Sequence, residues 1–216
     1  MKFINLFVSA LALFTLCACS NGEYVVDLNK PVKLVLDDST GPVVYVATAT
    51  DNRLFIGSEA QPNLPSGEIL SKDYKARAYA RLKSFGNQAG AMLLPGDKTV
   101  ASLIKEVIEQ ALSDSGYQVV SALALEDEQK AAIIALDIKQ FWTYSQLDKI
   151  NADIVNEAKI DVYIQQNNTQ KKLSLNNKQT KKVLTDTKGQ YQTTTEASLA
   201  NIYHLACEKF PQVIKK

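Results

Sequence analysis

The sequence has few of the residues from which most enzyme sites are built. Its 216 residues include one histidine, His204, and three cysteines. A histidine-based metal site or catalytic triad needs partners that this composition does not visibly supply. The sequence also lacks a Gly-x-Ser-x-Gly elbow, a phosphate-binding loop and an HExxH zinc helix. It therefore predicts no catalytic residue, no bound metal and no cofactor, and we expect a protein that is not an enzyme.

An excess of charge of either sign is also missing. The chain has 24 basic and 23 acidic residues. Lys2 lies in a leader that we expect to be removed, which leaves the mature chain with equal numbers of both signs. A neutral body offers no electrostatic basis for binding nucleic acid or for a polybasic membrane contact.

A long hydrophobic run is absent except at the N-terminus. Lys2 precedes an uncharged apolar stretch, Phe3 to Leu16. A transmembrane helix needs about 20 apolar residues, so this run is too short to span a bilayer. Its proportions are those of a secretory signal peptide.

The end of this run resembles a lipobox, the bacterial signal for lipid attachment. Leu16-Cys17-Ala18 places a large aliphatic residue and small residues before Cys19. The resemblance implies that Cys19 takes a diacylglyceryl group on its thiolate and, after cleavage, a further acyl chain such as palmitate. Cys17 stands where Ala, Ser or Thr is usual, and it is small enough to fit. The alternative is an ordinary secreted protein whose cysteines lie near its cleavage site.

The residue after the lipidated cysteine predicts the destination. An Asp there usually retains a Gram-negative lipoprotein in the inner membrane, whereas this chain has Ser20. We therefore expect an outer-membrane lipoprotein that faces the periplasm. Cys207 is then the remaining free thiol, so no intramolecular disulfide is available. It falls on the apolar face of an expected helix, which favours a buried, inert thiol.

The composition predicts three segments. Residues 1–18 form the signal peptide, 19–42 a lipidated tether with the first strands, and 43–216 a single α+β periplasmic domain. Within this domain, residues 51–96 are rich in proline and glycine and lack strong periodicity, which predicts a long irregular loop. Basic residues and tyrosines interleave near its middle, and a solvated loop without a specific role is the alternative. The expected partner contacts are Arg53, Tyr74, Arg77 and Arg81.

Regular elements follow the loop. Apolar residues recur at helical spacing from Thr99 to Tyr117 and again from about Thr193 onwards. Between these helices, residues 131–144, 152–165 and 172–183 predict three antiparallel strands with short connections. The expected fold is therefore an α+β two-layer sandwich, in which an antiparallel sheet carries two amphipathic helices on one face. In the first strand one face should carry Ile134, Leu136, Ile138, Trp142 and Tyr144.

Much of the chain resembles the YajG-like family of uncharacterised bacterial outer-membrane lipoproteins. The matching segments are LLPGDKTVASLIKEVIEQALSDSGYQVV, AAIIALDIKQFWTYSQ and INADIVNEAKIDVYI, together with the upstream Asp51-Asn52-Arg53-Leu54-Phe55 turn. The resemblance implies a periplasm-facing lipoprotein with an α+β domain. It supplies no substrate.

The expected function is that of a non-enzymatic accessory or binding lipoprotein of the cell envelope, with a protein partner. The alternative is a lipoprotein that binds a small ligand or a lipid between its helices and its sheet. Trp142, Tyr144 and Tyr203 would then line the cavity, unless these aromatic side chains simply fill the core.

Overall fold

A computed structural model describes most of the chain beyond the leader. The described residues are 22–31, 41–55, 71–84, 87–124, 130–148, 151–184 and 187–215. The predicted signal peptide and Cys19 therefore lie outside the described residues, as does part of the predicted loop. Among the described residues, no helix combines the length and the apolar character needed to cross a membrane.

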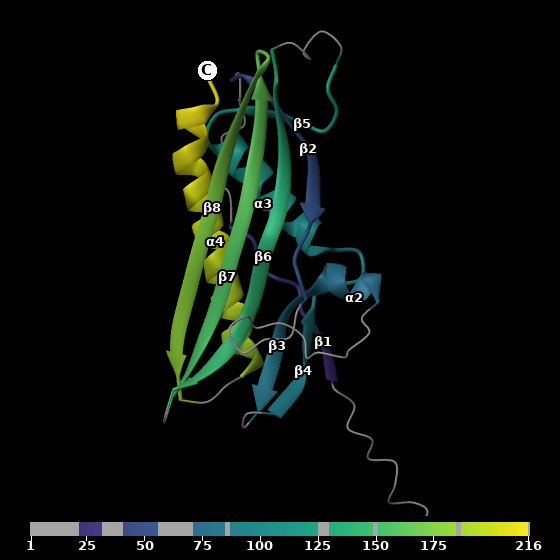
Figure 1. The fold of residues 1–216 in the computed structure, drawn as a ribbon, viewed down its shortest axis with the longest axis vertical. Coiled ribbons are helices and arrows are strands. Elements are labelled where there is room, and N and C mark those ends of the chain that lie inside the picture. The colour runs from purple at the N-terminus through teal and green to yellow at the C-terminus, as the bar shows by residue number, and fades with distance from the viewer. Residues whose placement is uncertain are drawn as a thin grey trace, which may run out of the picture.

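The described residues form one eight-stranded sheet and three helices (Figure 1). The strands are β1 (Gly22–Val25), β2 (Val43–Asp51), β3 (Ala78–Ser84), β4 (Asn87–Leu93), β5 (Gln118–Val120), β6 (Ala132–Asp148), β7 (Asn151–Gln166) and β8 (Thr169–Val183). The helices are α2 (Lys72–Arg77), α3 (Val100–Asp114) and α4 (Lys188–Val213).

The long strand β6 divides the sheet. One of its edges pairs with β7 along almost its whole length, and β7 pairs in turn with β8. The other edge is shared: β2 pairs with residues 132–138, and β3 pairs at Thr143. The sheet therefore forks, with β5 beyond β2 on one branch and β4 and β1 beyond β3 on the other.

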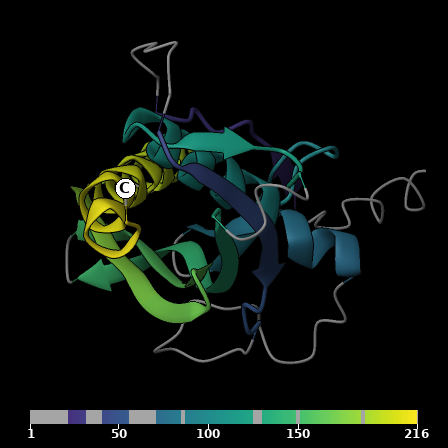
Figure 2. The same cartoon turned by 90° about the horizontal axis from the view of Figure 1, so that it is seen from above.

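Helices α3 and α4 lie side by side on one face of the sheet. Figure 2 shows the strands curving around both helices, and in Figure 1 the helices lie behind the sheet. The predicted stripe of α3 is buried throughout, and the Tyr203 hydroxyl of α4 donates to Asp114 at 2.7 Å. Apolar side chains of both helices and of the sheet share one core. The fold is thus α+β, as predicted.

The helix boundaries follow from local capping. Thr99 caps α3, since its hydroxyl accepts from the Ser102 N–H at 3.0 Å, and Gly116 follows the helix with a φ of +85°. Helix α4 begins earlier than the predicted Thr193, because the Gln190 side chain accepts from the Thr187 N–H.

The prediction of an antiparallel sheet is wrong for four of the seven strand pairs among the described residues. The meander β6–β7–β8 is antiparallel as expected, and so is the pair β3–β4. However, β2 pairs in parallel with both β5 and β6, β1 with β4, and β3 with β6. Parallel neighbours need long crossovers, and α3 lies within the one that separates β2 from β5 and β6. Such pairing leaves no local signal in the sequence.

The prediction of an irregular loop over residues 51–96 is also wrong for the second half of that stretch. Helix α2 and strands β3 and β4 occupy its second half, whereas residues 56–70 lie outside the described residues. The pairing of β3 with β4 shifts register between Ala78 and Ala80 and again between Leu82 and Lys83. These irregularities break the alternation by which a strand is recognised.

A β-bulge in β6 decides which side chains meet the helices. The register with β7 shifts between Ile138 and Gln140. Ile138 faces the helices, but beyond the bulge Phe141 does so, and Thr143 contacts Thr195 of α4 at 2.6 Å. The prediction that Trp142 and Tyr144 share a face with Ile134, Leu136 and Ile138 is therefore wrong. One extra residue sends both aromatic side chains to the opposite face of the sheet, here called the outer face.

Gly90 sets how closely β1 approaches β4. Its φ is +142°, and a Cβ there would lie 2.2 Å from the carbonyl oxygen of Gly22. We expect Gly90→Ala to lower the free energy of unfolding by about 1–3 kcal/mol, because the backbone conformation and the neighbour both exclude a side chain. The matched control is Gly96→Ala, since nothing lies within 4 Å of that added Cβ. Urea unfolding measures both variants, and equal stability would contradict this role for Gly90.

Candidate functional site

Arg53 closes the fork of the sheet. The last backbone hydrogen bond from this end of β2 runs from the Asn52 N–H to Ile138 O at 3.0 Å. Further along the same edge of β6, the carbonyl of Phe141 accepts from Arg53 Nη1 at 3.1 Å. The same nitrogen donates to Ala78 O at 2.7 Å, at the start of β3. The side chain of Arg53 thus joins strands that have separated.

Every N–H of the Arg53 guanidinium has an acceptor. Besides the two carbonyls, Nε and Nη2 each donate to Asp51 at 2.8 Å, and Nη2 also donates to Lys75 O at 2.6 Å. The side chain is only 4% exposed. Asp51 and Arg53 therefore form a structural ion pair within the turn. The side chain of Arg53 is too deeply buried to contact a partner directly, contrary to the prediction.

The guanidinium also positions an aromatic side chain. Its Cζ lies 5.1 Å from the centre of the Phe55 ring, a cation–π geometry. Phe55 meets Trp142 edge to face, with ring centres 5.7 Å apart and planes at 89°. These rings belong to a second, smaller apolar cluster on the outer face. Its members are Ala78, Ala91, Leu93, Trp142, Tyr144 and Val155, with Phe55 and Tyr74 packed against them.

A small hollow opens beside this cluster, and we call it the outer pocket. Its volume is about 190 Å³. It is lined by Arg53, Leu54, Phe55, Lys139, Gln140, Phe141, Trp142 and Lys159. Aromatic and aliphatic groups supply its apolar lining, and two lysines contribute positive charge.

Ion pairs cover the outer face around the pocket. Lys139 pairs with Asp137 at 2.6 Å, Lys172 with Asp161 at 2.8 Å, and Lys178 with Glu157 at 2.8 Å. The last two pairs join β8 to β7, and cross-strand pairs of this kind stabilise a sheet modestly. Lys159 projects between Glu157 and Asp161 on the same strand face. Within the described residues it makes no ion pair of its own.

Glu157 is the most heavily bonded of these carboxylates. It accepts from Gln140 at 2.9 Å and from the Tyr144 hydroxyl at 3.1 Å, besides its pair with Lys178. Burial raises the pKa of Glu157, but the hydrogen bonds from Lys178, Tyr144 and Gln140 outweigh burial and hold it below its usual value. The bonding network thus favours the ionised carboxylate in the folded protein.

This depressed pKa predicts a pH dependence. Above the unfolded pKa of about 4.3 the ionised Glu157 contributes its full stabilisation, which is lost as pH falls through the lower folded pKa. We expect the free energy of unfolding to fall between pH 5 and 3 by roughly 1 kcal/mol more in the wild type than in Glu157→Gln. Urea unfolding across this range measures the difference. Lys178→Met should reduce part of this fall in the free energy of unfolding between pH 5 and 3. An equal fall in all three proteins would contradict the role given to Glu157.

The structure separates the remaining predicted contact residues. Tyr74 packs against the outer aromatic cluster, together with Phe55. Arg77 makes its contacts outside this cluster: it donates to Leu94 O at 2.9 Å and pairs with Asp73 at 3.0 Å. Arg81 lies in β3 and does not line the outer pocket. Arg53 and Tyr74 thus meet around one site, whereas Arg77 and Arg81 do not join them.

The sequence did not predict three side chains of the outer pocket as site residues. Neither Lys139 nor Lys159 carries a sequence signal for a site, and the β-bulge beside Lys139 has no sequence signature. Phe55 carried a signal, because it ends the Asp-x-Arg-x-Phe turn noted in the family resemblance. That spacing puts Phe55 within reach of the Arg53 guanidinium.

The aromatic side chains that were predicted to line a ligand cavity between the helices and the sheet do not lie together there. Trp142 and Tyr144 point to the outer face, and Tyr203 bonds to Asp114 in the contact between α3 and α4. In the part of the chain that the structure describes, no group of three or more potential metal ligands comes together.

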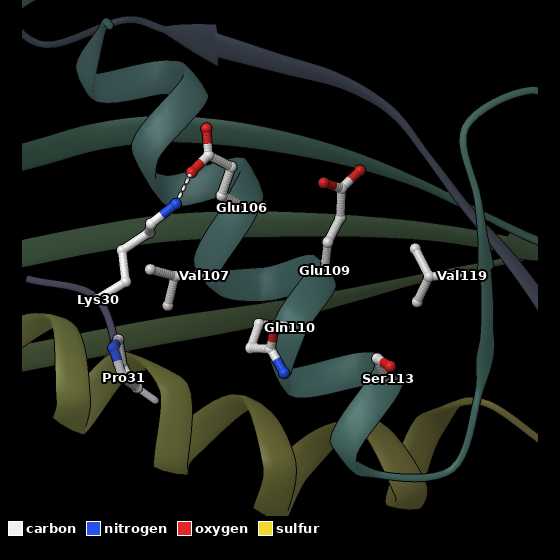
Figure 3. Close-up of a pocket in the computed structure, with 8 residues that line it drawn as sticks. All are labelled: Lys30, Pro31, Glu106, Val107, Glu109, Gln110, Ser113 and Val119. Carbon is white, nitrogen blue, oxygen red and sulfur yellow. Dashed lines mark hydrogen bonds and ion pairs between the residues drawn. The ribbon is translucent and has the colours of Figure 1, made fainter. Parts of the chain in front are cut away.

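A larger and shallower hollow runs beside α3. Its volume is about 460 Å³. Figure 3 shows Glu106, Glu109 and Gln110 projecting from α3, with Lys30 on one side and Val119 on the other. Lys30 pairs with Glu106, and burial raises the pKa of Glu109. Pro31 also lines this groove, and the chain beyond it, residues 32–40, lies outside the described residues.

Comparisons with known proteins assign no function to either hollow. No protein-family model matches the sequence, and no curated protein matches it. An uncharacterized protein of known structure is 10% identical with a TM-score of 0.48, over 87% of this chain and 96% of its own. A hypothetical protein from Chlamydia trachomatis is 10% identical with a TM-score of 0.41, over 78% of this chain and 94% of its own.

Proposed function

We propose that this protein is a lipoprotein of the bacterial cell envelope that binds another envelope component and catalyses no reaction. A lipid on Cys19 would hold it in the outer membrane, facing the periplasm. The lipobox-like Leu16-Cys17-Ala18-Cys19 supports the anchor. Membership of the YajG-like family, and a strictly two-layer arrangement of helices over sheet, belong to the same proposal.

The proposed anchor would hold the folded domain close to the bilayer. Only Ser20 and Asn21 separate Cys19 from Gly22, where β1 begins. An extended chain spans at most about 3.6 Å per residue, so such a short link would keep the lipid close to the folded domain. Because β1 pairs with β4, the branch of the fork that carries β4 would be the tethered one. A partner would meet a body held at the membrane surface.

The outer pocket is the observation that carries the binding role. It combines the rings of the buried Trp142 and the half-buried Phe55 with Lys159, which has no ion pair in the described structure. Buried aromatic anchors surrounded by polar groups are typical of protein-binding hot spots. The alternative, a periplasmic lipoprotein that binds a small ligand or a lipid, has less support. Sites for drug-sized ligands occupy about 300–1,000 Å³ and are mostly apolar. The outer pocket measures only about 190 Å³, and the hollow beside α3, at about 460 Å³, is shallow and lined mostly by polar and charged side chains.

Photo-cross-linking in intact cells tests the binding role. A photoreactive residue would replace Leu54 on the outer pocket, His204 on α4, or Leu184 after β8, since all three are exposed. We expect a covalent adduct with a second envelope component from at least one surface. Recovery of the unlinked monomer from every position, with normal abundance and membrane location, would overturn the proposal.

A further inference from the structure

Trp142 and Phe55 give the outer pocket an aromatic surface. Both rings line the pocket, and they meet edge to face with centres 5.7 Å apart. Trp142 is 3% exposed, and its indole Nε1 is itself covered. The indole ring therefore meets the pocket with its carbon atoms, which favours an apolar group as the occupant.

The size of the pocket limits what can enter it. A volume of about 190 Å³ lies below the range of about 300–1,000 Å³ that whole small molecules usually need. It suits a single side chain. Phe55 and Trp142 supply aromatic surface for such a group, and Phe55 is held in place by the fully bonded Arg53.

The charge around the pocket indicates which group of the partner would lie next to that side chain. Lys139 is neutralised by Asp137, and the nearby Glu157 and Asp161 pair with lysines of β8. Lys159 therefore supplies the surplus positive charge among the described residues that line the pocket. A carboxylate would complement it.

We propose that the outer pocket receives one apolar side chain of a partner polypeptide, next to a carboxylate that pairs with Lys159. This inference rests on the proposed function and names the chemistry of the partner. Arg53 acts only by positioning Phe55. The partner segment is thus apolar at its anchor and acidic beside it.

The single tryptophan of the chain reports directly on the pocket. The lipidated protein in nanodiscs would be titrated with N-acetyl-phenylalanine and, separately, with its uncharged amide. We expect saturable changes in Trp142 emission, with the acid binding about fivefold more tightly than the amide, as for a partly exposed ion pair. Lys159→Gln should remove this preference. Lys182→Gln on β8 should keep it.

Three results would overturn the inference. These are the absence of a saturable change at millimolar probe, equal binding of acid and amide, and an unchanged preference in Lys159→Gln. A further variant tests whether the chain fills its own pocket. If deletion of residues 57–69 changes Trp142 emission as strongly as saturating probe does, the occupant is this chain and the inference fails.

Cross-linking in cells separates this inference from the proposed function. Adducts from Leu54 and from a photoreactive residue at Lys159, lost on adding Phe55→Ala, would support the pocket as the docking site. Adducts from His204 or Leu184 alone would overturn the inference and leave the proposed function standing. Adducts from none of these positions would overturn both.

Discussion

Replacing Cys19 with serine is expected to release the protein from the membrane. In the wild type we expect nearly all of the protein in the membrane fraction, resistant to a high-salt wash and labelled by a palmitate analogue. In Cys19→Ser both membrane retention and labelling should disappear. The variant should be recovered as a soluble periplasmic form or as an unprocessed precursor.

The size of this effect follows from the absence of other membrane determinants. Each buried methylene of an acyl chain contributes about 0.8 kcal/mol, and two or three chains on one residue make the attachment durable. The body has nothing comparable. Its charge is balanced after the leader is removed, and no helix of its described part is suited to crossing a bilayer. We therefore expect that removing the proposed lipid releases the protein.

The other two cysteines of the chain provide matched controls. Cys17→Ser should remain anchored, because serine is common at that position of a lipobox. Cys207→Ser should also remain anchored, since its half-buried thiol lies against Ala111 O of α3, far along the chain from the signal. If Cys19→Ser stays in the washed membrane, or if Cys17→Ser is released equally, the lipobox assignment is wrong.

Replacing Arg53 with methionine is expected to lower the free energy of unfolding by about 3–5 kcal/mol. The variant leaves Asp51 without its ion-pair partner. It also strips the carbonyls of Lys75, Ala78 and Phe141 of their Arg53 donors at the fork of the sheet. Each buried group that loses its partner adds to the cost.

Arg77→Met is the control for this measurement. Arg77 bonds to one carbonyl, and its partner Asp73 is exposed, so we expect a loss of roughly 1 kcal/mol. Urea unfolding followed by Trp142 emission measures both variants, and circular dichroism provides a second probe. A loss below that of Arg77→Met would show that the fork does not depend on Arg53.

Arg53→Met should also affect binding of the probes. Its effect shows whether Arg53 only positions Phe55 or itself contacts the carboxylate. The variant loses the cation beside Phe55, so the wall of the outer pocket should loosen. We expect weaker binding of both N-acetyl-phenylalanine and its amide, with their ratio preserved by Lys159. A change in the ratio instead would mean that Arg53 itself contacts the carboxylate.

Local patterns determined the elements whose side chains repeat regularly. The helical spacing from Val100 to Leu112 predicted α3, and the two-residue alternation from Ile154 to Ile164 predicted which face of β7 is buried. Both periods reflect backbone geometry alone, so a single chain segment carries them. The Asp51–Arg53 ion pair was predictable for the same reason, because its partners lie two residues apart.

The tertiary structure alone decided the parallel pairing, the fork and the outer pocket. Parallel neighbours such as β2 and β6 are joined through long connections, and no local signal specifies them. One bulged residue before Gln140 reversed the faces of Trp142 and Tyr144, and thereby moved the aromatic site from the core to the outer face. Alternation records which residues share a face only while the register is regular. The short N-terminal lipobox needs no tertiary contact, which is why the sequence alone predicts the anchor, whereas the proposed docking site depends on side chains that only folding brings together.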